Sequence, residues 1–306
     1  MTARPIWKWA GSKRQLISEL NTYLIPLMNS GNINTYIEPF IGAGALMWSV
    51  IGNYKLDTVY FGDMNGELIT LYKMIKDSPD ELSSRLVKLA DEFLKDDNQE
   101  RQQKMFYKYR DEYNKLMDKY PDSDYTGQDA IELSAIFMFL NRTCFNGLYR
   151  VNKSGHFNVP CGKYKNPPID QTAQIKENSK LLNSIPNLTI AHAGYEKCLD
   201  LIDDKTFVYF DPPYRPITSS SAFTAYVASG FNDENQKELA QFCKEVDKRG
   251  GKFMLSNSDP HNEDPNDDFF DELYKDFTIE RVSASRAINS DGKKRGKINE
   301  ILVQNF

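Results

Sequence analysis

The segment FVYFDPPYRP, from Phe207 to Pro216, brings together residue types that suit chemistry on a planar amine. The exocyclic amine of a nucleobase is a poor nucleophile because its lone pair is delocalised into the ring. The Asp211 carboxylate and the Pro212 carbonyl can accept its two N–H bonds and so localise that lone pair. Tyr214 can stack on the ring, and the carboxylate can stabilise positive charge that develops on the nitrogen. The order Asp-Pro-Pro-Tyr, which includes Pro213, thus favours methyl transfer to such an amine over a simple proline-rich turn at a strand end.

A glycine-rich turn, EPFIGAGAL, is a candidate for binding a nucleoside. Gly42 and Gly44 follow a predicted strand and let the backbone approach a ligand closely. Asp63 ends the next predicted strand about 20 residues later, a spacing that suits a carboxylate on the two ribose hydroxyls. Met47 stands where a dinucleotide fingerprint has its third glycine, and the sequence has no GK[ST] motif. S-adenosylmethionine therefore fits better than a dinucleotide, although a structural turn of a doubly wound fold fits this stretch equally well.

The composition is typical of a globular protein with a substantial core. The 306 residues are 40% hydrophobic and 26% charged, which allows one large domain or one domain with an insertion. No run of about 18 apolar residues predicts a membrane span, and the N-terminus lacks the apolar centre of a secretory signal. The four cysteines, Cys144, Cys161, Cys198 and Cys243, form no CxxC pair. We therefore expect structural cysteines, no metal cage, no disulfide framework and a cytoplasmic location.

The net charge of −5 argues at first against a nucleic-acid partner, but the charge is unevenly distributed. Residues 141–165 hold five Lys or Arg and no Asp or Glu, and residues 281–299 hold six Lys or Arg and one Asp. The first 14 residues hold four basic residues and no acidic one, whereas 259–276 is strongly acidic. Local basic surfaces of this kind can bind phosphates, although each run by itself also fits a solvated face.

The elements expected around these residues indicate an α/β fold. Strands at 35–40 and 57–63 alternate with helices at 44–51 and 66–75, and a helix capped by Ser12 precedes them, so a parallel sheet is predicted. The middle reads as successive helices followed by a basic stretch, and we expect an inserted helical domain there. The helices are predicted at 78–95, 98–120 and 128–140.

The alternation of strands and helices then resumes. The predicted elements are strands at 187–191, 206–210 and 252–256, a helix at 233–248, and two final strands near 277–283 and 298–304. The strand at 206–210 is nearly all apolar, as expected of a strand buried on both faces. Asp211 would lie at its carboxyl end, where open α/β sheets bind their ligands.

Taken together, the motifs resemble those of the Dam-type DNA adenine N6-methyltransferases, the alpha group of the D12 class. The similarity runs from KWAGSKRQL near the N-terminus to RGKINEILV near the C-terminus, and includes EPFIGAGAL, VYFDPPYRP, SAFTAY and LSNS. It implies a Rossmann-like class I methyltransferase with a mixed sheet and an antiparallel strand near the C-terminus. It also implies a catalytic domain of residues 1–75 and 171–306, an inserted target-recognition domain of residues 76–170, and a monomer that binds double-stranded DNA.

The resemblance assigns residues to the cofactor. Lys13 would belong to the segment at the methionine end, Asp63 would bind the ribose, and Tyr195 would lie against the adenine. Gly194 stands where many relatives have an aspartate. The full set implied for S-adenosylmethionine is Trp9, Ala10, Gly11, Lys13, Glu38, Phe40, Gly42, Gly44, Asp63, Tyr195 and Asp211, and the catalytic element is Asp211, Pro212, Pro213 and Tyr214.

The resemblance also assigns residues to DNA and implies methylation of the adenine in GATC after base flipping. Arg150 matches a guanine-reading arginine, Asn146, Leu148 and Pro160 match base-contacting positions, and Phe145 matches an aromatic that inserts into the base stack. Cys161 replaces a usual aromatic after Pro160. The remaining positions expected at DNA are Lys8, Asn152, Lys153, Lys163, Tyr164 and Lys165, Ser219 and Ser220 in a loop over the flipped base, and Lys293, Lys294 and Arg295 in a basic hairpin.

Two other functions stay open from the sequence. An RNA or protein amide methyltransferase would use a related motif, but the basic insertion, rich in Asn and Arg, favours duplex DNA. A DNA-binding module with an inactive methylase pocket is the other alternative. Intact Asp211, Tyr214, Asp63 and Lys13 argue against it.

Overall fold

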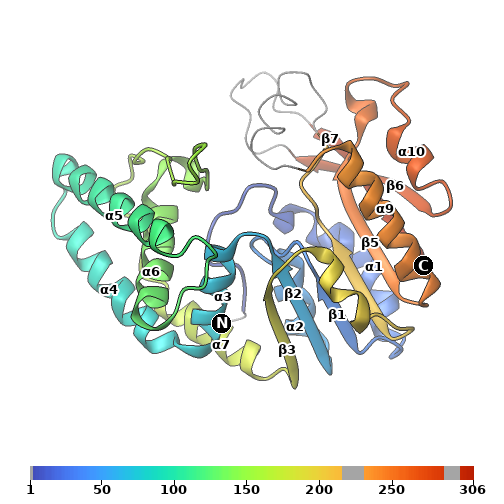
Figure 1. The fold of residues 1–306 in the computed structure, drawn as a ribbon, viewed down its shortest axis with the longest axis horizontal. Helices are drawn as coiled ribbons and strands as arrows, with labels where there is room; N and C mark the ends of the chain where they lie inside the picture. Colours follow the sequence, from blue (N-terminus) through green and yellow to red (C-terminus); the bar gives the residue numbers. More distant parts are fainter. Residues whose placement is uncertain (1–2, 216–230, 286–296) are drawn as a thin grey trace. The chain divides into compact units, whose positions relative to one another are not determined.

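A computed structural model describes residues 3–215, 231–285 and 297–306, and it contains a seven-stranded sheet in the order β3-β2-β1-β4-β5-β7-β6 (Figure 1). Strand β1 pairs in parallel with β2 and β4, and β4 pairs in parallel with β5. Strand β7 is antiparallel to both β5 and β6. The predicted α/β class with a mixed sheet is therefore confirmed. The strands are β1 (Thr35–Glu38), β2 (Thr58–Asp63), β3 (Asn187–His192), β4 (Thr206–Phe210), β5 (Lys252–Ser258), β6 (Thr278–Ser285) and β7 (Lys297–Gln304).

The chain forms two compact units. Unit 1 comprises Met1–Lys13, Gly42–Tyr54 and Asp63–His192, and unit 2 comprises Arg14–Ile41, Lys55–Gly62 and Ala193–Phe306. The predicted division into a target-recognition domain of residues 76–170 and a catalytic domain of the remaining residues concerns function. These two structural units do not test it, and it stays a proposal. No helix in the described ranges is long and apolar enough to cross a membrane.

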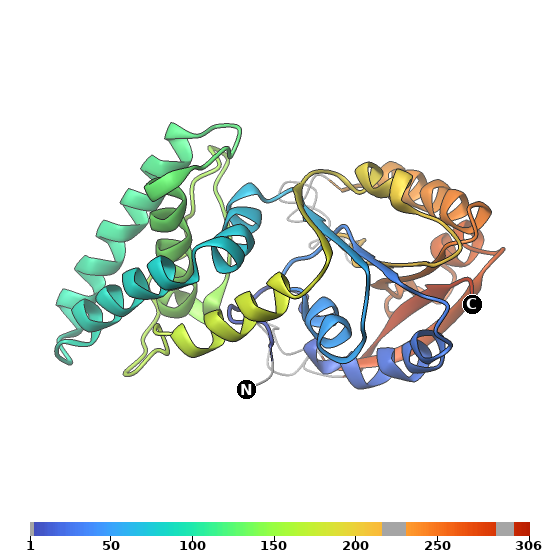
Figure 2. The ribbon, with the colours of Figure 1, turned by 90° about the horizontal axis from the view of Figure 1, so that it is seen from below.

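Unit 1 is mainly helical, and its helix α6 is buried over most of its length. Eleven of its 17 residues are buried, and nine of them form the continuous run 133–141, as expected of a helix segment enclosed by its neighbours. Helix α6 packs against α3, α4 and α5, and Figure 2 shows these helices, coloured cyan to green, side by side. The helices of this unit are α2 (Ala45–Asn53), α3 (Gly66–Asp77), α4 (Pro79–Leu94), α5 (Gln99–Lys119), α6 (Gly127–Thr143) and α7 (Thr172–Asn183).

Helix α7 was not predicted from the sequence, because its inner face is partly polar. Gln174 and Asn178 are buried, and both bind Arg4 near the N-terminus. The Arg4 backbone N–H donates to Asn178 Oδ1 at 3.1 Å, and Asn178 Nδ2 donates to the Arg4 carbonyl at 2.9 Å. These amides lie where an amphipathic helix usually has apolar side chains, so the periodic apolar pattern that predicts a helix is missing here.

Unit 2 holds α1 (Ile17–Asn29), α9 (Asp233–Lys248) and the short α10 (Phe269–Leu273), and α9 lies along β5 (Figure 1). Helix α9 has the predicted bounds, since Asn232 and Asn235 form a capping box at its start. The expected Ser12 cap of the first helix is wrong. Helix α1 begins at Ile17 without a side-chain cap, after a 3-10 turn at Lys13–Gln15.

Strand β4 positions Asp211. All five of its residues are buried, and Phe207, Val208 and Phe210 are fully inaccessible. Burial of such side chains contributes about 1.5–3 kcal/mol each. The parallel register places Ile37 of β1 opposite Val208 of β4, so both strands present their carboxyl ends, with Glu38 and Asp211, at one edge of the sheet.

Candidate active site and nucleic-acid interface

The turn after β1 is shaped by close contact between Trp9 and Gly42 in unit 1. Gly42 has a φ of +46°, and a Cβ built there would lie 2.8 Å from Trp9 Cδ1. The Gly42 carbonyl accepts a hydrogen bond from Tyr72 Oη at 3.1 Å. A side chain at position 42 is therefore excluded by conformation and by space, which explains the glycine.

Asp63 is oriented by backbone donors. Its Oδ2 accepts from the Gly42 N–H at 3.1 Å, and its Oδ1 accepts from the Asn65 N–H at 2.9 Å. Burial raises the pKa of Asp63, while these N–H groups and His192 oppose the shift. Each carboxylate oxygen has a further lone pair, so Asp63 can accept a pair of hydroxyl donors.

The N-terminal segment offers polar groups beside Trp9 in the sequence. Lys13 is buried, and its Nζ donates to the Gly11 carbonyl at 2.9 Å. Ser12 Oγ is buried and has no hydrogen-bond partner among the described residues. A buried hydroxyl without a partner costs about 1–3 kcal/mol, so a polar ligand group at this place would be stabilised.

Asn141 joins the N-terminal segment to the basic stretch that follows α6. Its side chain accepts from the Lys8 N–H and donates to the Lys8 carbonyl, both at 2.8 Å, and it also donates to the Gly147 carbonyl at 3.0 Å. Gly147 has a φ of +65°, and a Cβ there would meet Lys8 Cδ at 2.3 Å. The exposed Asn146 donates its N–H to Tyr164 Oη at 3.0 Å, and Lys8 Nζ lies 5.5 Å from the Tyr164 ring centroid.

Arg150 lies on a tight hairpin of residues 150–158. Its Nε donates to Asn158 Oδ1 at 2.7 Å, while the side chain as a whole is exposed. The hairpin turns through Asn152, whose Oδ1 accepts from the N–H groups of Ser154 and His156. Arg150 is thus an exposed arginine on a supported backbone, as readout of a base edge requires.

In unit 2, Phe40, predicted for the cofactor pocket, lies beside Tyr195, predicted to lie against the cofactor adenine. The rings of Phe40 and Tyr195 are 5.7 Å apart, and Tyr195 packs edge-on against Phe242 at 5.1 Å. Burial raises the pKa of Tyr195 to about 12. Glu38 is buried and accepts from Tyr36 Oη at 2.5 Å.

The backbone after Asp211 is held by two buried amides. Gln236 Nε2 donates to the Pro213 carbonyl at 3.0 Å, and Gln236 Oε1 accepts from Asn257 Nδ2 at 3.1 Å. Asn257 Oδ1 in turn accepts from the Arg215 N–H at 3.1 Å. No described residue donates to the Pro212 carbonyl. Among the described residues, therefore, the Pro213 carbonyl has a donor and the Pro212 carbonyl has none.

Tyr214 is fixed through its hydroxyl. The Tyr214 Oη donates to Glu300 Oε2 of β7 at 2.7 Å. Burial raises the pKa of Tyr214 well above its usual value, and the nearby charges of Asp211 and Glu300 act in the same direction. The phenol therefore stays neutral, and its ring is held in a set orientation for stacking.

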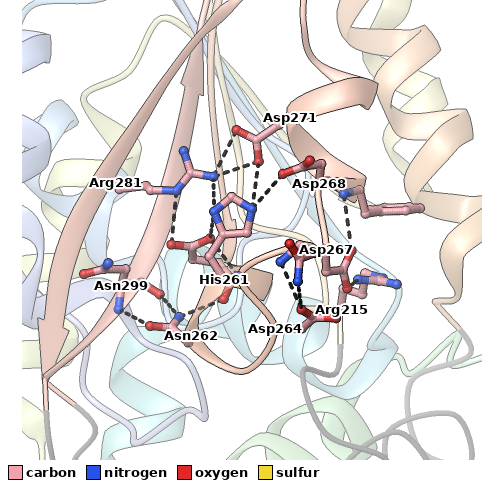
Figure 3. Close-up of polar contacts among 12 residues, drawn as sticks. Arg215, His261, Asn262, Asp264, Asp267, Asp268, Asp271, Arg281 and Asn299 are labelled. Atoms are coloured by element: carbon pink, nitrogen blue, oxygen red, sulfur yellow. Dashed lines mark hydrogen bonds and ion pairs between the residues drawn. The ribbon is translucent and has the colours of Figure 1, made fainter.

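Two arginines, Arg215 and Arg281, bind three of the eight carboxylates in the acidic segment 259–276 (Figure 3). Arg215, the residue after Tyr214, binds Asp267 at 2.6 Å and Asp233 at 3.0 Å. Arg281 binds Asp271 at 2.7 Å and the buried Asp259 at 3.2 Å. The acidic run therefore anchors the chain just beyond the Asp-Pro-Pro-Tyr motif and is not simply a solvated face.

Several of the residues predicted to contact DNA lie at the surface. Phe145 is 53% exposed, and Lys153, Pro160, Lys163 and Lys165 are exposed as well. Leu148 is half-buried, and its carbonyl faces Cys144 Sγ at 3.3 Å. Ser219, Ser220, Lys293, Lys294 and Arg295 lie outside the described residues.

The cysteines lie in environments that disfavour the thiolate. All four are free, and three are buried. Burial raises the pKa of Cys144 to about 12 and that of Cys198 to about 12. Nucleophilic catalysis by these two groups is therefore disfavoured.

Three supporting residues, Gln236, Asn257 and Glu300, were not picked out from the sequence. Asn257 was noted only as part of LSNS, and a polar residue inside an otherwise buried strand would have been the signal. Glu300 lies in an alternating strand and gave no signal of its own. Its role depends on the pairing of β7 beside β5.

Comparison with known proteins agrees with these features. The family model of the D12 class N6 adenine-specific DNA methyltransferases matches residues 9–288. The chain is 43% identical to a Type II methyltransferase of Methanocaldococcus jannaschii, M.MjaIII, over 100% of both chains. It is 37% identical to the Type II methyltransferase M1.LlaDCHI of Lactococcus lactis over 99% of this chain and 95% of the relative.

A third relative is the DNA adenine methylase of Escherichia coli K12, which is 30% identical over 98% of this chain and 94% of its own length. The family match covers both the glycine-rich turn and the Asp-Pro-Pro-Tyr motif. This chain belongs to the D12 class of N6 adenine-specific DNA methyltransferases.

Proposed function

We propose that the protein methylates the adenine of GATC in duplex DNA, as a monomer, by flipping the base and transferring a methyl group directly from S-adenosylmethionine. The observation that carries the chemistry is the difference between the two proline carbonyls. Gln236 occupies the Pro213 carbonyl, whereas no described residue donates to the Pro212 carbonyl. Asp211 and Pro212 therefore form the pair of acceptors that an exocyclic amine needs.

The residues of unit 2 carry out the following steps in this proposal. Tyr214, held by Glu300, stacks on the extruded adenine. Asp211 and the Pro212 carbonyl accept the two N–H bonds, so the nitrogen lone pair points away from the ring plane. The C–N bond would form as the bond from the methyl carbon to the sulfonium sulfur breaks, which leaves S-adenosylhomocysteine, while Asp211 stabilises the positive charge on the nitrogen and takes up the N–H proton by way of its hydrogen bond.

The residues present fit S-adenosylmethionine, which when bound supplies an electrophilic methyl group. Asp63 has lone pairs for the ribose hydroxyls, and Lys13 and Ser12 Oγ, which has no partner among the described residues, suit the polar amino-acid end. Gly42, with no room for a Cβ, lets the backbone approach the ligand. Phe40 and Tyr195 provide aromatic faces for the adenine.

The assignment of GATC rests on the hairpin that carries Arg150. Asn158 orients the guanidinium through Nε and, at 3.5 Å, through Nη2, and the remaining N–H groups of Nη1 and Nη2 can donate to a guanine edge. Phe145 is exposed, as an aromatic that enters the base stack must be. Lys153 and Lys163 are exposed and are assigned to phosphates, which set the register of the protein on DNA without reading the sequence.

The experiment that tests this function is methyl transfer from labelled S-adenosylmethionine to unmethylated plasmid DNA, read at base resolution. N6-methyladenine confined to GATC is the expected result. Methyladenine at another sequence would keep the chemistry and overturn the reading of residues 145–160. Methylation of RNA or of protein amides with none on DNA would refute the proposal, and so would an inert protein that still binds DNA.

Replacement of Asp63 with alanine is expected to weaken S-adenosylmethionine binding by roughly 10- to 150-fold, since hydrogen bonds to a charged group contribute about 1.5–3 kcal/mol. Isothermal titration calorimetry measures this change. The matched control is Asp57→Ala, an exposed aspartate beside the other end of β2. Equal affinity losses in the two variants would contradict the role of Asp63.

The pH dependence of cofactor binding gives a further prediction for Asp63. Burial raises the pKa of this carboxyl above its ordinary value, so it takes up a proton at a higher pH than an exposed aspartate. Protonation removes acceptor capacity, and affinity is therefore expected to fall as the pH drops through the raised pKa. Titrations at several pH values should show this fall in the wild type and not in Asp63→Asn.

Replacement of Glu300 with alanine is expected to lower kcat by up to about 100-fold, because misplacement of a reacting group by about 1 Å has effects of this size. Glu300→Gln retains an acceptor for Tyr214 Oη and should recover most of the activity. Steady-state kinetics with a GATC duplex tests both. Glu280, in the neighbouring strand β6, offers a control, and Glu280→Ala should leave kcat unchanged.

A further inference from the structure

Tyr149 lies between the cofactor-facing N-terminal segment and the Arg150 hairpin. Its ring stacks on Trp9 with centroids 5.4 Å apart and an interplanar angle of 27°, and on Phe137 at 5.4 Å and 28°. Trp9 and Phe137 are themselves stacked at 6.3 Å. The three rings form one cluster, so displacement of Trp9 must displace Tyr149 or open a gap in packed aromatic surface.

The hydroxyl end of Tyr149 is held by a buried carboxylate. Tyr149 Oη donates to Glu67 Oε2 at 3.5 Å, and Tyr125 Oη donates to Glu67 Oε1 at 2.8 Å. Glu67 is 8% exposed, in the first turn of α3. Burial raises the pKa of Tyr149, and the charge of Glu67 adds to the shift, so the phenol remains a proton donor. The ring is thus held at its face and at its polar tip.

Tyr149 also contacts the far strand of the hairpin. Its ring lies 5.8 Å from that of Phe157, a buried residue. The Phe157 N–H donates to Asn114 Oδ1 at 2.9 Å, and Asn114 Nδ2 donates to the Phe157 carbonyl at 3.2 Å. Arg150 follows Tyr149 directly in the chain, and its carbonyl accepts from the Asn158 N–H at 3.0 Å. The position of the Tyr149 ring therefore affects the backbone from which Arg150 projects.

At its other end the aromatic cluster contacts the cofactor turn. Trp9 lies against Gly42, and the Gly42 N–H holds the Asp63 carboxylate. A ligand that orders Trp9, Gly42 and Asp63 would also order the ring that Trp9 stacks on. Contacts run without a gap from Asp63 through Gly42, Trp9 and Tyr149 to the Arg150 backbone.

We propose that Tyr149 is a positioning residue that couples cofactor binding to DNA recognition. The inference rests on the proposed function, since it assumes that Trp9 and Asp63 serve the cofactor and that Arg150 serves DNA. Coupling of this kind is reciprocal, so a bound cofactor tightens cognate DNA binding by the same factor as DNA tightens cofactor binding. Tyr149 carries this coupling without touching either ligand.

The test compares the affinity of a GATC duplex with and without saturating S-adenosylhomocysteine, which cannot react. The ratio of the two dissociation constants is the coupling factor, and typical values are about 5 to 150. Tyr149→Leu removes the stacked ring and is expected to bring the factor to within about 2-fold of unity. Tyr149→Phe keeps all rings and removes only the hydroxyl at the polar tip, so it is expected to give an intermediate factor.

Tyr109→Leu is the matched control. Tyr109 is 5% exposed, lies in unit 1, and donates its hydroxyl to Glu92 at 3.0 Å, yet it belongs to helix α5 and packs on Phe139. It should lower thermal stability while the coupling factor stays at the wild-type value. A loss of coupling in this variant equal to that in Tyr149→Leu would overturn the assignment, because general loosening would then explain both.

The remaining outcomes separate the inference from the proposed function. Wild-type protein that methylates GATC but shows no coupling overturns the inference and leaves the proposed function standing, and unchanged coupling in Tyr149→Leu does the same. If Tyr149→Leu does not fold, wild-type coupling in Tyr149→Phe overturns the inference. Wild-type protein that binds no S-adenosylhomocysteine and methylates no DNA refutes the proposed function, and the inference with it.

Discussion

Replacement of Asp211 with alanine is expected to lower kcat by about 10³-fold, because removal of one preorganised group that stabilises transition-state charge has effects of about 10²–10³. Asp211 directly follows the buried strand β4 and is the only carboxylate of the Asp-Pro-Pro-Tyr motif. The loss should appear mainly in kcat, since the developing charge exists only in the transition state. Single-turnover methyl transfer to a GATC duplex measures it.

The control for Asp211 is the binding of the variant to its ligands. DNA affinity should stay near the wild-type value, because the proposed base-reading residues lie at 145–160. Asp211→Asn keeps the size of the side chain and one acceptor oxygen, and it should retain more activity than the alanine variant. Full activity in Asp211→Ala would refute the proposed mechanism and would agree with a protein whose function is only to bind DNA.

Replacement of Arg150 with alanine is expected to reduce discrimination at the guanine of GATC by roughly 5- to 160-fold, since a bidentate contact to guanine contributes about 1–3 kcal/mol. The Arg150 Nε is held by Asn158, so the geometry of the contact is set before DNA binds. Competition between GATC and duplexes with a changed first base gives the ratio of kcat/KM values. The ratio should fall while the rate on near-cognate sites changes little.

Lys153, on the same hairpin, supplies the contrast. Lys153→Ala should weaken binding to all duplexes alike and lower the slope of log affinity against log salt by about 1. In Arg150→Ala, the slope of log affinity against log salt should stay close to its wild-type value. If both variants behave as phosphate contacts, with uniform weakening and retained discrimination, the GATC reading of residue 150 is wrong.

The amino-acid sequence by itself determined the class of fold and the enzyme family. Strand β4 is continuously apolar and is followed at once by Asp-Pro-Pro-Tyr, so the local pattern predicts both a buried strand and a reactive end. Helix α9 was predicted with correct bounds because Asn232 provides a local cap. These features depend on neighbours in the chain, which is why sequence reasoning reached them.

Other features were decided only by the tertiary structure. Helix α7 buries Gln174 and Asn178 against Arg4, which lies more than 160 residues away in the chain. No local apolar pattern therefore predicts this helix. The proposed first cap at Ser12 failed because the chain turns once more before α1 begins at Ile17. Helix caps and long-range hydrogen bonds of side-chain amides depend on the backbone geometry, which residue types alone do not determine.

The supports of the candidate site belong to this second group. Residue types predicted Tyr214 and Arg150, but Glu300 and Asn158 acquire their roles only when β7 pairs with β5 and when the hairpin closes. The same holds for Tyr149, whose contacts with Trp9 and Glu67 join segments 140 and 82 positions apart. Sequence motifs name the groups that meet a ligand, whereas the groups that orient them are brought there by long-range packing.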